Sequence, residues 1–239
     1  MKYMGGKLKL AKYLVPIINM YRKPNQVYIE PFVGGANIID KMIGKRIGND
    51  INTYLIAFWK AVTNGWTPPP YITREEYAHI RAHKEEYPLH LVGWAGFCCS
   101  YCGVWFGGFS GDVCTQSGAY RKYQEEVWRY VSKQIPVLKN VLFLNKSYQD
   151  LEIPKNSLVY CDPPYYGVSQ YTEQFDHTAF WKWCSIQRKN NCTLLLSEYS
   201  APTELFRKIW EKPIKSSLRV TATGKKAKET TEALFLLRP

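Results

Sequence analysis

The segment Asp162-Pro163-Pro164-Tyr165 combines residue types and an order that could do chemistry. It follows an apolar run that begins at Leu158, so it lies where a buried strand is expected to end. Proline fixes φ, lacks an N–H and restricts the residue before it, so the proline pair stops the strand. A carboxylate, a backbone carbonyl and a ring side by side suit a flat amine, which needs two acceptors and a stacking face. The alternative is an ordinary strand-ending turn.

A second segment of this kind runs from Val27 to Asn37 and contains Glu30-Pro-Phe-Val-Gly-Gly35. It predicts a short buried strand, a glycine turn and the start of a helix, the usual construction of a nucleotide-type site at the carboxyl edge of a sheet. The acid Glu30 at the strand end favours a cationic group over a phosphate. A P-loop is excluded because no Gly-Lys-Ser/Thr follows.

The segment Lys45-Arg-Ile-Gly-Asn-Asp50 predicts another strand that ends in an acid. An acidic residue about 20 positions after a glycine turn commonly binds the two hydroxyls of a ribose. Asp50 lies 15 residues after Gly35 and fits this role loosely. The alternative is that Asp50 caps a helix over residues 51–64.

The chain begins Met-Lys-Tyr-Met-Gly-Gly-Lys, in which Tyr3 and Lys7 flank a glycine pair. Glycine lets backbone approach a ligand closely, and the two flanking side chains suit stacking and charge pairing. A frayed basic terminus would look the same. We expect an amphipathic helix over residues 8–21, bent or shortened by Pro16.

Composition predicts a globular cytoplasmic protein. The 239 residues are 46% hydrophobic and 15% aromatic, which is enough for a large core or a core with a small inserted domain. No stretch approaches the ~20 apolar residues of a membrane span, and the N-terminus lacks the apolar core of a signal peptide. Seven cysteines, an odd number, favour reduced thiols.

The net charge of +12 points to a polyanionic partner, because an excess of Lys and Arg suits phosphate neutralisation. The first 29 residues hold six basic residues and no acid. The segment from Arg207 to Lys228 holds eight basic residues against Glu211 alone. Solubility is the alternative explanation for the charge.

The run Asn64-Gly-Trp-Thr-Pro-Pro-Pro70 marks a boundary, after which the alternation of strands and helices stops. We therefore expect a catalytic domain of residues 1–65 and 135–239, and a small, mostly helical insert of residues 66–134. A capping box at Thr73 and Glu76 predicts a helix over residues 73–87. Residues 94–109 hold six aromatics, four glycines and no charge, which indicates a packed loop core or a surface for stacking exposed bases.

Two further sets of expectations concern metal and the second half of the chain. The spacing of His79, His83, Cys99 and Cys102 is compatible with zinc, although the cysteines lie in the aromatic run. Strands are expected over residues 141–145, 158–161, 193–197, 217–221 and 232–237, the last two forming an antiparallel pair at a sheet edge. Helices are expected over residues 176–189 and 201–210.

The order of these motifs resembles that of the Dam-type DNA adenine methyltransferases of the alpha arrangement, over most of the chain. Tyr3-Met-Gly-Gly-Lys7, Glu30-Pro-Phe-Val-Gly-Gly35 and Gly48-Asn-Asp50 are similar to the cofactor motifs of that family. Asn145-Lys-Ser-Tyr-Gln-Asp150 is similar to the segment beside the cofactor adenine, and residues 158–165 to the catalytic strand. The insert departs from the family pattern, so the resemblance implies no target sequence such as GATC.

The resemblance implies an α/β fold: a Rossmann-like, seven-stranded, mainly parallel sheet with an antiparallel closing strand. It implies S-adenosylmethionine as cofactor and double-stranded DNA as partner, with no metal, in a bacterial or phage-encoded monomer or weak dimer. The implied catalytic residues are Asp162, Pro163 and Tyr165. The implied cofactor-binding residues are Tyr3, Lys7, Glu30, Phe32, Gly34, Gly35, Asp50, Tyr148 and Asp162.

The mechanism expected from this resemblance starts from the exocyclic amine of adenine, whose lone pair is delocalised into the ring. Hydrogen bonds to the Asp162 carboxylate and the Pro163 carbonyl favour a tetrahedral nitrogen, while Tyr165 stacks on the base. The adenine must be flipped out of the duplex, which costs on the order of a few kcal/mol.

Three rival functions stay open at this point. A cytosine-amine methyltransferase would more often carry Ser in place of Asp162. An RNA adenine enzyme would meet the same base edge. A catalytically silent nucleic-acid-binding module would not require Asp162, Pro163 and Tyr165.

Overall fold

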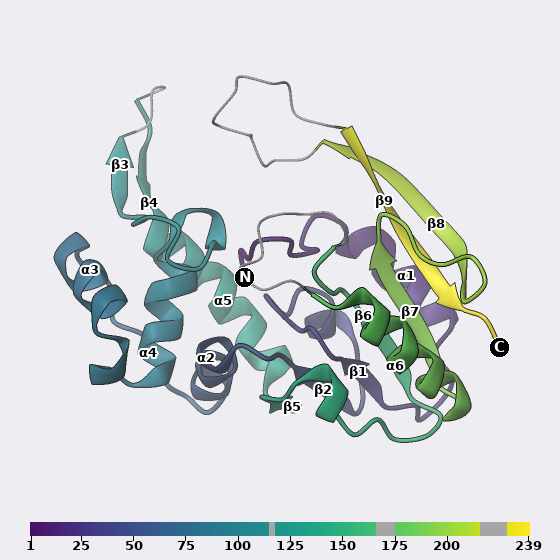
Figure 1. The fold of residues 1–239 in the computed structure, drawn as a ribbon. Helices are drawn as coiled ribbons and strands as arrows, with labels where there is room; N and C mark the ends of the chain where they lie inside the picture. The colour runs from purple at the N-terminus through teal and green to yellow at the C-terminus, as the bar shows by residue number, and fades with distance from the viewer. Residues whose placement is uncertain (115–117, 166–174, 216–228) are drawn as a thin grey trace. The chain divides into compact units, whose positions relative to one another are not determined.

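The computed structural model describes residues 1–114, 118–165, 175–215 and 229–239. The chain divides into two compact units, one of residues 1–16 and 32–151 and the other of residues 17–31 and 152–239. The strands of the main sheet follow the order β5-β2-β1-β6-β7-β9-β8 (Figure 1). The predicted fold class is confirmed: the sheet is seven-stranded and mainly parallel, and β9 runs antiparallel to its neighbours.

The first unit contains β2 (Arg46–Asn49) and β5 (Val141–Leu144), which pair in parallel from Arg46↔Val141 to Asn49↔Leu144. Val141 and Phe143 of β5 are buried, whereas the side chain of Leu142 is 56% exposed. Helix α2 (Thr53–Thr63) contacts β5, and its Trp59 ring lies nearly parallel to that of Phe143 at a centroid distance of 6.1 Å. Alternation along β5 therefore directs one face of the strand to α2.

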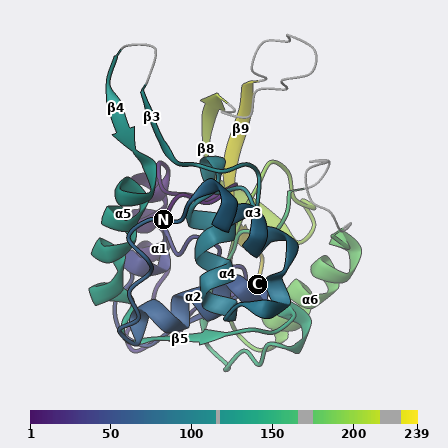
Figure 2. The ribbon, with the colours of Figure 1, turned by 90° about the vertical axis from the view of Figure 1, so that its left-hand side faces the viewer.

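Around these strands the first unit adds helices and a short hairpin. They are α3 (Arg74–Ala82), α4 (Leu89–Gly93), β3 (Asp112–Cys114), β4 (Tyr120–Lys122) and α5 (Tyr123–Leu138). The capping box predicted at Thr73 and Glu76 is confirmed, although α3 ends at Ala82. The β3–β4 hairpin stands at the start of α5 (Figure 2).

The aromatic run of residues 94–109 mainly forms packed core. Trp94, Phe97 and Phe106 are buried, and the Phe97 and Trp105 rings lie 4.6 Å apart between centroids. A Cβ at Gly96 would lie 2.2 Å from Trp105, so glycine is required for this ring to pack. Of the predicted alternatives, the loop core is therefore the one found for these three rings, whereas Tyr101 is 67% exposed.

The second unit contains β1 (Tyr28–Glu30), β6 (Leu158–Cys161) and β7 (Thr193–Glu198), which pair in parallel. All residues of β1 and β6 are buried, as expected for parallel strands covered on both faces. Helix α6 (His177–Lys189) follows the N-cap Asp176 and contacts β7. Its buried residues include Phe180, Trp183 and Cys184. Helix α1 (Ala11–Met20) contains Pro16 as predicted and spans the boundary between the units.

The helix predicted over residues 201–210 is wrong. Residues 206–215 form strand β8 (Phe206–Lys215), which pairs antiparallel with β9 (Glu229–Leu237) from Phe206↔Leu237 onward (Figure 1). The long ladder with β9 outweighs the local helical pattern of this segment. The antiparallel pair at the sheet edge is thus β8 with β9, which also pairs with β7, and the expected strand over residues 217–221 lies outside the described residues.

The predicted domain boundaries at residues 66 and 134 stay a prediction. No helix in the described part of the chain is long and apolar enough to cross a membrane. All seven cysteines are free thiols.

Candidate functional site

In the first unit, Asp50 joins the glycine turn to the start of α2. One oxygen of its carboxylate accepts the Gly34 N–H at 3.1 Å, and the other accepts the Asn52 N–H at 3.0 Å. Burial raises the pKa of Asp50, and its backbone hydrogen bonds oppose that rise. The N-cap of α2 is Asn52, whose side chain accepts the Leu55 N–H, so the alternative role for Asp50 as helix cap is wrong.

Two contacts from neighbouring elements fix the same turn. The Val33 N–H donates to the Asn49 carbonyl at 2.8 Å, which ties the turn to the end of β2. The Trp59 indole N–H donates to the Gly34 carbonyl at 3.0 Å. The glycine turn is therefore held from β2 and from α2, and Asp50 lies between them.

The glycines of this turn admit the ring of Tyr3. Gly34 has a φ of +45°, and a Cβ there would lie 2.9 Å from Cε1 of Tyr3. A Cβ at Gly35 would lie 2.8 Å from Cβ of Tyr3. Lys7 is buried and donates to the Gly5 carbonyl at 3.0 Å within the same N-terminal segment. The predicted motifs at residues 3–7 and 30–35 thus meet at Tyr3.

Gln134 of α5 also orders this turn, a role that was not predicted from the sequence. Its amide nitrogen donates to the Ala36 carbonyl at 3.1 Å and to an Asp40 carboxylate oxygen at 3.0 Å. The signal was present: Gln134 follows Val127 and Val131 on the buried face of α5. A polar residue on an apolar helix face needs a buried partner, which here is the glycine turn.

Phe32 and Tyr148 form an aromatic pair beside the ends of β2 and β5. Their centroids are 5.4 Å apart, with the rings inclined by 41°. Asn49 ties the two strand ends together, because its amide donates to the Lys146 carbonyl at 2.9 Å and its oxygen accepts the Lys146 N–H at 3.1 Å. Tyr148 lies in a short 3-10 helix directly beyond β5.

In the second unit, Glu30 ends β1 beside β6. The parallel register Tyr28↔Leu158 and Ile29↔Val159 brings Glu30 level with Tyr160. Glu30 is 3% exposed, and one carboxylate oxygen accepts the Tyr28 hydroxyl at 2.7 Å. Burial, followed by the Glu30 charge, raises the pKa of Tyr28 well above its ordinary value, so this phenol stays a donor.

Asp162, Pro163 and Tyr165 directly follow β6 in the same unit. Asp162 is partly exposed and Pro163 is buried. The Tyr165 hydroxyl donates to the carboxylate of Glu232 on β9. Burial raises the pKa of Tyr165 well above its ordinary value, and the charges of Asp162 and Glu232 raise it further. Tyr165 is therefore a neutral phenol.

Two buried acids around this strand end were not predicted from the sequence. Glu198 ends β7 with no exposed surface, and Glu232 of β9 is 2% exposed. Glu198 ends the run Leu194-Leu-Leu-Ser-Glu198, and Glu232 begins the run Glu232-Ala-Leu-Phe-Leu236. An acid inside such a run signals a buried carboxylate that needs a partner.

The predicted site residues are thus divided between the units. Asp162, Pro163, Tyr165 and Glu30 belong to the second unit. Tyr3, Lys7, Phe32, Gly34, Gly35, Asp50 and Tyr148 belong to the first. Within the first unit contacts link Tyr3, Gly34 and Asp50, and separately Phe32 and Tyr148.

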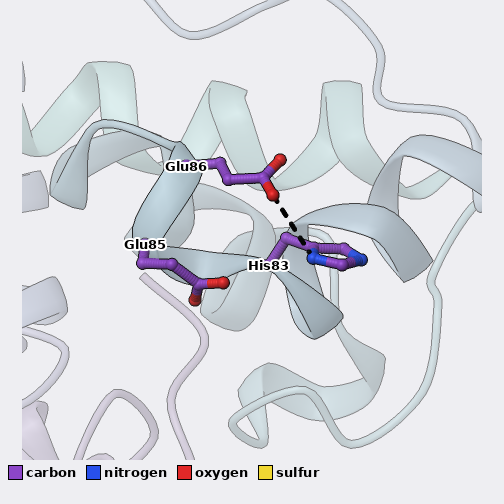
Figure 3. A group of neighbouring side chains, drawn as sticks. All are labelled: His83, Glu85 and Glu86. Atoms are coloured by element: carbon purple, nitrogen blue, oxygen red, sulfur yellow. Dashed lines mark ion pairs between the residues drawn. The ribbon is translucent and has the colours of Figure 1, made fainter.

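The residues considered for zinc do not gather as the spacing suggested. Among the described residues, the ligand atoms of His83, Glu85 and Glu86 lie close together, and neither Cys99 nor Cys102 belongs to this group (Figure 3). His83 and Glu86 lie 3.4 Å apart on an exposed helical turn. Cys99 is fully buried, and burial raises the pKa of its thiol well above the ordinary value. An exposed pair of this kind is common without a metal.

Comparison with known proteins finds similarity to DNA methyltransferases. Residues 3–88 match the family model of the D12 class N6 adenine-specific DNA methyltransferases. The chain is also similar to the type II methyltransferase M.FokI of Planomicrobium okeanokoites, with 26% identity over 200 residues. That alignment covers 69% of this chain but 28% of M.FokI. The two matches confirm the resemblance to adenine-specific DNA methyltransferases predicted from the sequence.

Among solved structures, the chain is similar to SMU.472 complexed with SAH, at 10% identity and a TM-score of 0.38. The likeness covers 95% of this chain and 52% of the other.

Proposed function

We propose that the protein is a site-specific methyltransferase that modifies the exocyclic amine of a flipped adenine in double-stranded DNA, with S-adenosylmethionine as methyl donor. The observation that carries the proposal is the end of β6. There, a buried parallel strand is followed within four residues by Asp162, Pro163 and a neutral Tyr165. The family match over residues 3–88 supports the same chemistry.

The residues of the first unit suit the proposed methyl donor. Asp50 offers carboxylate oxygens at the glycine turn, the usual partner of ribose hydroxyls. The rings of Phe32 and Tyr148 suit a flat adenine, and the ring of Tyr3 lies over the glycines. We assign nine residues to cofactor binding, as the resemblance implies: Tyr3, Lys7, Glu30, Phe32, Gly34, Gly35, Asp50, Tyr148 and Asp162. S-adenosylmethionine supplies an electrophilic methyl group on a sulfonium.

The residues beyond β6 would act on the nucleophile. Asp162 and the Pro163 carbonyl accept the two N–H groups of the adenine amine, which favours a tetrahedral nitrogen with a localised lone pair. Tyr165 stacks on the base and replaces part of the stacking lost on flipping. An Asp at position 162 favours adenine over cytosine as the target.

The DNA partner is supported by the family match and by the charge of +12. Residues 66–134 are proposed as the insert that selects the target. The remaining parts of the proposal are a cytoplasmic location in a bacterial or phage-infected cell and action as a monomer or weak dimer.

The proposal is tested by incubating the protein with S-adenosylmethionine and unmethylated duplex DNA. We expect 6-methyladenine among the digested nucleosides, measured by mass spectrometry. Sequencing of the methylated DNA would then give the target site. Methyl label in RNA or protein with none in DNA would contradict the proposal.

A smaller effect is expected at the aromatic pair. Replacing Tyr148 with alanine removes one face of the proposed adenine pocket, and this should weaken S-adenosylmethionine binding roughly tenfold, or about 1.4 kcal/mol. Tyr148→Phe keeps the ring and should bind as the wild type does. Calorimetric titration measures both, and equal losses for the two variants would place the role in the hydroxyl group.

A further inference from the structure

The side chain of Tyr165 is held from two directions within the second unit. Its hydroxyl donates to the carboxylate of Glu232, which is 2% exposed. Its ring meets the ring of Tyr199 at a centroid distance of 4.7 Å and an angle of 88°. One contact fixes the far end of the ring and the other fixes its plane.

Tyr199 is itself anchored by a buried acid. Its backbone N–H donates to one oxygen of Glu198, which has no exposed surface. The other Glu198 oxygen lies 3.6 Å from Nε2 of His177, at the start of α6. The support for the Tyr165 ring therefore reaches from β9 through β7 to α6.

Stacking on a base depends on the plane of the ring, and a tyrosine side chain reaches that plane through only two torsions. A hydrogen bond at the hydroxyl and a perpendicular ring contact restrict both torsions before a base arrives. A restricted ring loses little entropy when the base stacks on it. The burial of Glu232 adds to this effect, because a buried carboxylate holds its donor more strongly than an exposed one does.

We infer that Glu232 and Tyr199 are positioning residues for the flipped base, acting through Tyr165 rather than by contact with the base or the methyl donor. This inference rests on the proposed function and extends it to two residues. Losing either residue should impair use of DNA and leave the affinity for S-adenosylmethionine unchanged.

The test measures methyl transfer from radiolabelled S-adenosylmethionine to unmethylated genomic DNA, with calorimetric titration of the methyl donor alone. For Glu232→Gln and for Tyr165→Phe we expect kcat/KM for DNA to fall about tenfold, because each weakens the same charge-assisted hydrogen bond. The double variant should be no worse than either single variant, since residues acting through one contact are not additive. The dissociation constant of S-adenosylmethionine should change less than about twofold.

Two controls separate positioning from a general loss of structure. Glu211→Gln makes the same chemical change at an exposed position of β8 and should keep wild-type activity. At the second support, Tyr199→Ala should lower activity on DNA, whereas Tyr199→Phe keeps the ring contact and should restore it. Tyr199 is 38% exposed, so these variants test the inference even if Glu232→Gln does not fold.

Wild-type activity in both Glu232→Gln and Tyr199→Ala would overturn the inference. So would losses that multiply in the Tyr165→Phe, Glu232→Gln double variant, or an equal loss of S-adenosylmethionine affinity. If the wild-type protein methylates no DNA, the proposed function fails together with this inference. If the wild type methylates DNA and these variants keep its activity, only this inference fails.

Discussion

Replacing Asp162 with alanine is expected to lower methyl transfer to DNA by on the order of 10²–10³-fold or more, because it removes the acceptor that we propose for the reacting amine. Asp162 is partly exposed at the end of β6 and belongs to neither the strand nor the core. The variant should therefore fold and unfold as the wild type does. Single-turnover transfer from labelled S-adenosylmethionine measures the loss, and circular dichroism checks the fold.

Two further variants sharpen this prediction. Asp162→Asn keeps one acceptor oxygen and the side-chain volume, so its activity should fall between those of the wild type and the alanine variant. Glu204→Ala removes an exposed acid from the second unit, outside every motif of the proposed site, and should leave transfer unchanged. Retained activity in Asp162→Ala would remove this residue from the mechanism.

Replacing Asp50 with alanine is expected to weaken S-adenosylmethionine binding by on the order of 100-fold, since two hydrogen bonds to a charged group are worth about 3 kcal/mol or more. The same change leaves the Gly34 and Asn52 N–H groups without their acceptor, so the glycine turn is also less ordered. Calorimetric titration gives the dissociation constant. An unchanged affinity in a folded variant would exclude Asp50 from the cofactor site.

The pH dependence of S-adenosylmethionine binding by the wild type gives a second readout of the role of Asp50. Burial raises the folded-state pKa of Asp50 above its unfolded value, so ionising the group in the folded state costs stability as the pH rises through that pKa. The contribution of Asp50 to the free energy of unfolding is therefore fully present below its unfolded-state pKa and is lost as the pH rises through its folded-state pKa. Binding has the opposite sign, because a protonated Asp50 offers fewer acceptors to ribose hydroxyls. Affinity of the wild type should fall as the pH drops through the raised pKa, and Asp50→Asn should lose that part of the profile.

Local signals in the sequence predicted most strands and the order of the site motifs. The apolar run ending at Asp162 predicted β6, because two prolines cannot continue a central strand. The capping box at Thr73 and Glu76 predicted the start of α3 for a similarly local reason. Such signals depend on neighbours within a few residues, and distant packing does not change them.

Other assignments depended on residues far apart in the chain. A helix was predicted over residues 201–210, but Phe206–Lys215 forms β8 because β9 offers it a long antiparallel ladder. The role of Asp50 was open between a helix cap and the glycine turn. The structure decided against the cap, because Asn52 has the capping geometry and Asp50 accepts the N–H of Gly34, 16 residues away.

The sequence by itself therefore determined the motif chemistry: a carboxylate, a carbonyl and a ring at residues 162–165, and an acid after a glycine turn. Tertiary structure alone decided what supports them. Gln134 and Glu232 reach their partners, the Ala36 carbonyl and the Tyr165 hydroxyl, across 98 and 67 residues of chain. The physical reason is that a buried polar group needs a partner. The local sequence indicates that such a residue needs a partner, but the fold decides which distant group it meets.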